Sequence, residues 1–162
     1  VLETLGVTLN AKKTRIVNIA QGFCFLGFKI GRGKGVSLSQ AKIKSKLNRQ
    51  NLYAIPAQKS VDRFKEAVRA NTRRRIPLKT SELIEKLNPI VRGWGNYYKR
   101  AHVRRLFNQL DRWIVRRIWS HRYKKWRCGG WKTLPESRLR SELKLISLVG
   151  LIPSIRAAKV HS

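Results

Sequence analysis

Positive charge constrains this chain more than any other feature. The 162 residues include 37 lysines and arginines against 8 aspartates and glutamates, a formal net charge of +29 at pH 7. A compact chain with this charge repels itself unless polyanions neutralise it. Because 42% of the residues are hydrophobic, a core can form and wholesale disorder is excluded. The sequence therefore predicts a folded nucleic-acid-binding protein; a solvated basic surface and a patch for anionic membranes are the alternatives.

Hydrophobic stretches and cysteines bear on the compartment. The longest mostly apolar stretch, residues 143–155, is interrupted by polar, glycine and proline residues and is shorter than the roughly 20 residues of a membrane span. Cys24 and Cys128 lie far apart and form no disulfide framework, which favours a reducing compartment. We therefore expect a cytoplasmic location and no membrane partner. The chain has no methionine, so we expect it to be part of a longer protein.

The first 56 residues have the pattern of strands. Residues 14–19 are rich in β-branched side chains, and Gln21-Gly22 is typical of a turn. Residues 23–30 then alternate, which predicts one strand with Cys24, Leu26, Phe28 and Ile30 on the same side. Residues 36–38 are expected to return as an edge strand. Together these runs predict a β-hairpin unit.

From about residue 57 the pattern becomes helical. Ser60 is expected to cap a helix that buries Val61, Phe64 and Val68. Thr80 or Ser81 is expected to cap the next helix, whose apolar stripe comprises Leu83, Leu87, Ile90, Trp94 and Tyr98. Either Pro89 kinks this helix, or Asn88 caps a further helix that begins there.

A third helix has the clearest periodicity and is expected to end near residue 128. Its apolar face comprises Val103, Leu106, Phe107, Leu110, Trp113, Ile114 and Ile118. A short helix is expected near residues 137–143. The sequence thus predicts an α-rich α+β fold with three parts: a β-hairpin unit at 1–56, a three-helix bundle at 57–132 and a C-terminal extension at 133–162.

Catalytic chemistry is not supported by the acidic residues. The two aspartates, Asp62 and Asp111, are predicted on different helices, so they cannot hold the paired metal ions of polymerases and nucleases. We expect Asp111 to form a surface ion pair with Arg112. The three histidines have no metal-ligand spacing with the cysteines and no arrangement typical of a nucleophile triad. We therefore expect no complete active site, no metal and no cofactor.

Two separated stretches carry a resemblance to a known family. Residues 5–16 followed by 22–28 resemble the end of the palm in group II intron-encoded reverse transcriptases. Residues 87–98, which read Leu-Asn-Pro-Ile-Val-Arg-Gly-Trp-Gly-Asn-Tyr-Tyr, resemble the signature of the maturase-specific (thumb, or X) domain of the same proteins, and residues 110–119 continue it. Residues 148–154 are similar to the natural C-terminus of some members. The resemblance covers about residues 1–132.

This resemblance implies a fragment of a multidomain protein from a bacterial or organellar interior. In the family, fingers and palm copy RNA into DNA, while thumb and palm clamp intron RNA to promote splicing. The family's Tyr-x-Asp-Asp motif is not found here, so the chain alone is expected to lack RNA-directed DNA polymerase activity, and Mg²⁺ would belong to the parent polymerase. The implied partners are group II intron RNA and, in the parent protein, the RNA template with its DNA primer and the fingers and palm domains. A general basic nucleic-acid-binding protein, associated with ribosomes or DNA, is the alternative.

The resemblance and the charge pattern together nominate site residues. By position, Phe25, Leu26, Gly27 and Phe28 match the primer-grip hairpin, although core packing is the favoured role for Phe28. Trp94 and Tyr98 are expected in the core, and Gly93 and Gly95 are expected to allow close approach of a helix or of RNA. The expected RNA-binding residues are basic or aromatic: Lys12, Lys13, Arg15, Arg73, Arg74, Arg75, Arg92, Tyr97, Lys99, Arg100, Arg104, Arg105, Arg112 and Arg116. For residues 12–15 a solvated loop, and for residues 73–75 a balance to the helix dipole, are the alternative roles.

Overall fold

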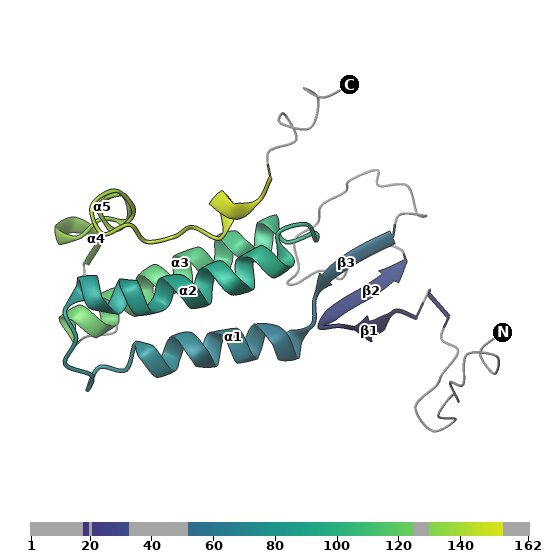
Figure 1. The fold of residues 1–162 in the computed structure, drawn as a ribbon, viewed down its shortest axis with the longest axis horizontal. Coiled ribbons are helices and arrows are strands. Elements are labelled where there is room, and N and C mark those ends of the chain that lie inside the picture. The colour runs from purple at the N-terminus through teal and green to yellow at the C-terminus, as the bar shows by residue number, and fades with distance from the viewer. Residues whose placement is uncertain (1–17, 20, 33–51, 125–129, 154–162) are drawn as a thin grey trace, which may run out of the picture. The chain divides into compact units, whose positions relative to one another are not determined.

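The structure is a computed structural model that describes residues 18–19, 21–32, 52–124 and 130–153 (Figure 1). The chain divides into two compact units, Val1–Ala54 and Ile55–Ser162. Strands lie near the N-terminus and helices follow. The fold class is therefore α-rich α+β, as the sequence predicts. The expected strand residues 14–17 and 36–38 lie outside the described residues.

The hairpin forms at a different place from the one predicted. Strand β1 (Phe23–Phe25) pairs antiparallel with β2 (Phe28–Arg32), and Phe25 lies opposite Phe28. The chain reverses at Leu26 and Gly27, whose φ angles of 46° and 79° are both positive, as a two-residue type I′ turn requires. The prediction of one strand over 23–30 was wrong, because this two-residue turn interrupts the alternation. The turn expected at Gln21-Gly22 is present, where the Gly22 N–H donates to the Ile19 carbonyl at 3.2 Å.

A third strand, β3 (Leu52–Pro56), completes a sheet in the order β1-β2-β3. This strand was not predicted from the sequence. Gly31 on β2 is buried against Tyr53 on β3, and a Cβ at Gly31 would lie 2.6 Å from the Tyr53 hydroxyl oxygen. Gly31 is therefore needed for close packing of β2 on β3, since any side chain would displace the tyrosine.

Three helices form the main body of the second unit. They are α1 (Gln58–Asn71), α2 (Thr80–Tyr98) and α3 (Arg104–Tyr123), and they run side by side in Figure 1. The buried face of α1 is the predicted one. The core also contains residues beyond the predicted stripes, Ile84 and Val91 on α2 and Val115 on α3. Helix α3 ends at Tyr123, before the predicted residue 128, and Lys124 ends it in a left-handed conformation.

Aromatic side chains join the three helices near the C-terminal end of α2. The Trp94 ring centroid lies 4.6 Å from that of Phe64 on α1 and 5.7 Å from that of Phe107 on α3. Ser60 was expected to cap α1, but the helix begins at Gln58 and the Ser60 hydroxyl has another role. Its Oγ accepts from Trp94 Nε1 at 3.4 Å and lies 2.6 Å from the Tyr98 hydroxyl. Tyr98 is thus a buried core residue, as predicted, whereas Trp94 is half-buried and packs against the aromatic rings of the core.

Helix α2 continues through Pro89 as one helix, so the alternative in which Asn88 begins a new helix is wrong. Its N-cap is Lys79 rather than Thr80 or Ser81. Asn88 instead holds the C-terminal segment: its Nδ2 donates to the Lys144 carbonyl at 3.1 Å, and its Oδ1 accepts from the Ile146 N–H at 3.0 Å. Asn88 therefore makes a tertiary contact to the C-terminal segment instead of capping a helix.

The C-terminal segment contains α4 (Gly130–Thr133), α5 (Glu136–Ser141) and a 3₁₀ turn, η2 (Val149–Leu151). It lies across α2 and α3 on the side away from α1 (Figure 1). Leu148 is fully buried there, and Gly95 on α2 allows this approach, since a Cβ at Gly95 would lie 2.8 Å from Leu148 Cδ2. The extension is therefore part of the packed helical unit.

Asp111 fixes the same segment. The expected surface ion pair with Arg112 was wrong, because the Asp111 side chain is buried on α3 and faces the 3₁₀ turn. Its carboxylate accepts from the Leu148 N–H at 2.9 Å, the Val149 N–H at 3.2 Å and the Ser147 hydroxyl at 2.8 Å. A carboxylate at the start of a helical turn satisfies N–H groups that have no partner within the turn. Asp111 therefore has a structural role.

Candidate nucleic-acid interface

The outer face of α3 is basic along its length. Arg104, Arg105, Arg112 and Arg116 are exposed, as are the amide side chains Asn108 and Gln109 between them. We call these six residues the α3 stripe. Its members fall three or four positions apart, so they share one side of the helix. In the part of the chain that the structure describes, no carboxylate lies within 4 Å of these four guanidinium groups.

The C-terminal segment has a different charge arrangement. Arg140 lies 2.5 Å from Glu136 and 3.8 Å from Asp111, and Arg138 lies 2.6 Å from Glu142. The hydrogen bond from Arg138 to Glu142 raises the pKa of Arg138 from its ordinary value. The arginines of the α3 stripe have no such partners among the described residues. Their positive charge is directed to solvent.

Two hollows lie beside the α3 stripe. One, of about 550 Å³, is lined only by polar members of the stripe: Arg104, Arg105, Asn108, Gln109 and Arg112. The other, of about 370 Å³, lies between α1 and α3, and its lining is mixed: Lys65, Leu106, Gln109, Leu110, Arg112, Trp113 and Arg116. The two hollows share Gln109 and Arg112, so they adjoin one another.

Further positive charge lies on the α1 side of the second hollow. The Arg69 guanidinium lies over the Trp113 ring, 5.7 Å from its centroid. Burial, followed by the positive charges of Arg69 and Arg74, lowers the pKa of Arg117 from its ordinary value. Cations of α1 and α3 therefore lie close enough to repel each other, and a bound anion would relieve that repulsion.

Basic residues in the C-terminal half of α3 have a structural role as well. They bind the connection between α1 and α2. Arg117 donates to the Thr72 hydroxyl at 3.0 Å, and Arg122 donates to the Thr80 hydroxyl at 3.2 Å. Lys124 donates to the Arg74 carbonyl, and the His121 Nε2–H donates to the Ile76 carbonyl at 2.9 Å. Not all of the excess charge is therefore free for a ligand.

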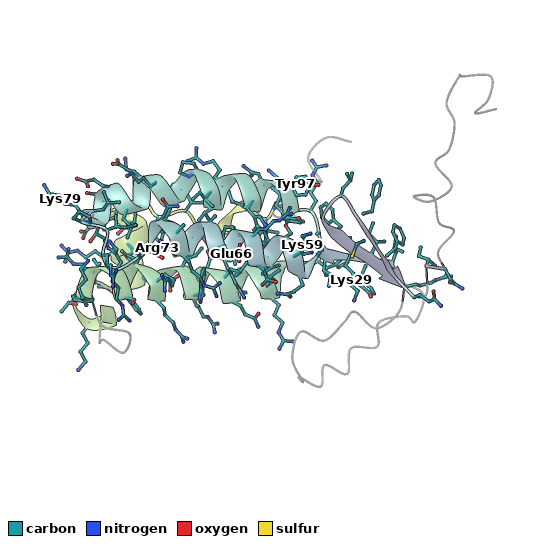
Figure 2. All side chains as sticks on the ribbon, turned by 90° about the horizontal axis from the view of Figure 1, so that it is seen from below. Lys29, Lys59, Glu66, Arg73, Lys79 and Tyr97 are labelled. Atoms are coloured by element: carbon teal, nitrogen blue, oxygen red, sulfur yellow. The ribbon has the colours of Figure 1, made fainter. Side chains whose placement is uncertain are left out.

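The predicted cluster at Arg73, Arg74 and Arg75 lies on this connection, and its three side chains are exposed. Arg74 Nε donates to the Ser120 hydroxyl at 3.1 Å, so part of its hydrogen-bonding capacity is used within the fold. Figure 2 shows Arg73 and Tyr97 toward opposite ends of the helical unit. The predicted residues therefore do not form a single cluster.

A second group of predicted residues lies on α2 and just beyond it. Arg92 and Arg100 are exposed, and the Tyr97 side chain is 54% exposed, with its ring packed edge-on against Tyr98. Lys99 is half-buried and its Nζ donates to the Asn96 amide oxygen at 3.2 Å. Gly93 is exposed, and a Cβ at this position would meet no atom within 4 Å, so no packing contact explains the glycine. This surface is distinct from the α3 stripe.

The nominated primer-grip residues occupy the tip of the hairpin. Phe25 and Leu26 are 58% and 68% exposed, Gly27 is exposed, and Phe28 is half-buried. A positive φ at Leu26, a residue that rarely adopts it, is a local strain that places an apolar side chain in solvent. Lys12, Lys13 and Arg15 lie outside the described residues.

Four residues at the interface were not predicted from the sequence: Lys65, Arg69, Asn108 and Gln109. The amides carry no charge and so gave no signal in a count of cations. Their spacing of three or four positions from Arg105 and Arg112 could have placed both amides on the same face of α3 as the arginines. Lys65 and Arg69 lie one turn apart on α1, but nothing in the sequence places that helix beside Trp113.

The described residues thus form a basic three-helix domain in which the arginines on the outer face of α3 have no acidic partner within that part of the chain. Residues 61–137 match the family model described as group II intron, maturase-specific domain. The matched range contains most of α1 and all of α2 and α3, so these three helices are similar to a group II intron maturase-specific domain. A search of curated proteins finds no match.

None of the helices among the described residues is long and apolar enough to cross a membrane. No group of three or more histidine, cysteine, aspartate or glutamate side chains in those residues is placed to hold a metal ion.

Proposed function

We propose that the helical unit is a maturase-specific domain, that it binds group II intron RNA and assists its splicing, and that in a parent reverse transcriptase it serves as the thumb. The α3 stripe carries the proposal. Four guanidinium groups on one helix face, without carboxylate partners in the described part of the chain, form a surface suited to phosphates.

Arginine suits this task because its planar guanidinium donates two parallel hydrogen bonds to a phosphate. The stripe from Arg105 to Arg116 extends over about 16 Å at the α-helical rise. This length accommodates several successive phosphates of an RNA strand. Contacts to phosphates position an RNA without reading its sequence, so recognition of an intron would depend on the folded shape of the RNA.

The exposed hairpin tip and the α2 surface support the thumb role. Phe25 and Leu26 present apolar side chains at a tight turn, and Tyr97 presents an aromatic ring next to basic residues. Aromatic rings such as those of Phe25 and Tyr97 stack on unpaired bases. Both features belong to elements distinct from the α3 stripe, which is consistent with contacts to more than one part of a nucleic acid.

The test is binding of the full chain to a folded group II intron RNA over a series of salt concentrations. The logarithm of the affinity should fall linearly with the logarithm of salt. The variant R112Q/R116Q should reduce the magnitude of that slope by about 1.4–1.8, because each of the two lost phosphate contacts changes it by roughly 0.7–0.9.

The matched control is K59Q/R63Q, which removes the same charge from an exposed face of α1 that also carries Asp62 and Glu66. This control should change the slope much less. Competitors then separate the two candidate functions. Duplex DNA or heparin that displaces the intron RNA as well as unlabelled intron RNA does would favour a general nucleic-acid-binding protein. Equal slopes for the two double variants would refute the role of the α3 stripe.

A further inference from the structure

We propose that the hollow between α1 and α3 receives the base of an unpaired nucleotide. The proposal rests on the proposed RNA-binding function and names one subsite within it. The hollow has about 370 Å³, which lies in the range of small-ligand sites. Its walls combine an apolar side, an uncharged amide and a basic rim, and each of these suits one part of a nucleotide.

The apolar wall consists of Leu106, Leu110 and Trp113. Leu106 and Trp113 belong to the apolar periodicity of α3, yet the structure leaves both half-buried while their neighbours Phe107 and Ile114 are buried. Part of the apolar face of α3 is therefore not covered by the core of the helical unit. The excess apolar surface opens into the hollow, where a flat base could cover it.

Trp113 also differs from Trp94 and Trp119 in its indole N–H. Trp94 Nε1 donates to the Ser60 hydroxyl, and Trp119 Nε1 donates to the Leu134 carbonyl at 2.9 Å. The Trp113 N–H has no hydrogen-bond partner among the described residues. The indole N–H at this half-exposed site is therefore available to donate to a ligand.

Gln109 supplies the polar contact. Its side chain is exposed, lines the hollow and makes no hydrogen bond within the described part of the chain. An amide both donates and accepts, so it can pair with the edge of a base. A base in a duplex has its Watson–Crick edge occupied, and the mixed lining therefore favours an unpaired nucleotide.

The rim supplies the charge that the flanking phosphates require. Lys65, Arg112 and Arg116 line the hollow, and Arg69 lies over Trp113. The adjoining hollow shares Gln109 and Arg112 but has a wholly polar lining, which suits a phosphate better than a base. A strand that crosses α3 could thus place a phosphate in one hollow and its base in the other.

The positive charge, the aromatic wall and the amide together favour RNA over an acidic peptide as the occupant. Every charged residue that lines the two hollows is positive. An acidic peptide would satisfy the rim but would not use the aromatic wall and the free amide together. A nucleotide would contact the basic rim, the aromatic wall and the amide together.

The experiment measures the affinity of the full chain for three RNA hairpins at one salt concentration. The first has a single unpaired nucleotide, the second has an abasic residue at that position, and the third is fully paired. The unpaired nucleotide should bind about five-fold or more tighter than the abasic form, the lower end of the effect of base stacking on an aromatic side chain. Phosphate contacts are the same in the first two RNAs, so the ratio isolates the base.

Two neighbouring amides provide a matched pair of variants. Q109A should reduce the preference for the base over the abasic form, whereas N108A, an exposed amide that lines only the polar hollow, should leave it unchanged. W113L should abolish the preference while thermal unfolding reports whether the fold is retained.

The outcomes separate this proposal from the proposed function. Equal binding of the unpaired and abasic RNAs, with the salt slope intact, would overturn the base site and leave RNA binding by the α3 stripe standing. Loss of salt-dependent RNA binding would refute both. An acidic peptide that competes as well as the unpaired RNA would also overturn the base site.

Discussion

Two glycines on one helix provide a direct measurement of how tightly the C-terminal segment is packed. Gly93 and Gly95 lie two residues apart in α2, and each lowers helix stability by about 1 kcal/mol relative to alanine. Their surroundings differ completely. A Cβ at Gly93 meets nothing within 4 Å, whereas a Cβ at Gly95 would lie 2.6 Å from Leu151 Cδ1 and 2.8 Å from Leu148 Cδ2.

The two substitutions to alanine should therefore change the free energy of unfolding by different amounts. G93A should raise the free energy of unfolding by about 1 kcal/mol, because only helix propensity changes. G95A has the same gain, but two leucine side chains must move, and such overpacking costs about 1–3 kcal/mol. The gain in helix propensity is the same in both variants. The free energy of unfolding of G93A should therefore exceed that of G95A by about 1–3 kcal/mol.

Urea denaturation followed by far-ultraviolet circular dichroism at constant salt measures this difference. Leu151 is half-buried whereas Leu148 is fully buried, so truncating Leu151 costs less core packing. L151A should therefore remove one of the two steric contacts that the Cβ of G95A makes. The double variant G95A/L151A should then show a favourable coupling relative to the two single variants. Equal stability of G93A and G95A would refute the packing of residues 148–151 on α2.

Two other substitutions test the remaining structural claims. D111N should lower the free energy of unfolding by about 3 kcal/mol, because an amide cannot accept every hydrogen bond that the buried carboxylate receives from residues 147–149; urea denaturation measures this, and a change below about 1 kcal/mol would contradict it. L26N should slow amide exchange in β1 and β2, because Asn-Gly is the favoured pair for a turn with two positive φ angles. Unchanged or faster exchange would show that the hairpin is not limited by strain at Leu26.

Helix positions could be predicted from the sequence because long amphipathic segments carry a repeated signal. Val61, Phe64 and Val68 follow one another at helical spacing, and all three are buried. The ends were less predictable. Ser60 has the chemistry of a cap, but a tertiary contact to Tyr98 uses its hydroxyl, and the helix begins two residues earlier.

The hairpin shows the limit of a period-two pattern. Residues 23–30 alternate as a single strand would, but Leu26 and Gly27 form a turn in the middle. Leucine is a poor signal for this turn, because residues with a side chain avoid positive φ. Strand β3 was missed because its pairing with β2 depends on contacts such as Gly31 with Tyr53, which are distant in sequence.

Some features of the candidate site could be predicted from the sequence and others could not. Exposure of Arg104, Arg105, Arg112 and Arg116 followed from their place off the apolar face of α3, and the structure places all four on the surface. The role of Asp111 could not be predicted, since its backbone partner Leu148 lies 37 residues away in a segment without periodicity. Short-range pairing with Arg112 was the obvious sequence expectation, and burial overrides it.

Helix α3 shows how one segment can be both highly charged and well packed. Its apolar residues face the bundle, and Asp111 faces the C-terminal segment. Arg117, His121 and Arg122 donate to the α1–α2 connection, so part of the polar surface stabilises the fold. These roles leave the arginines of the α3 stripe without an intramolecular task in the described part of the chain. Because unpaired like charges on one helix destabilise it, their accumulation is best explained by an anionic ligand.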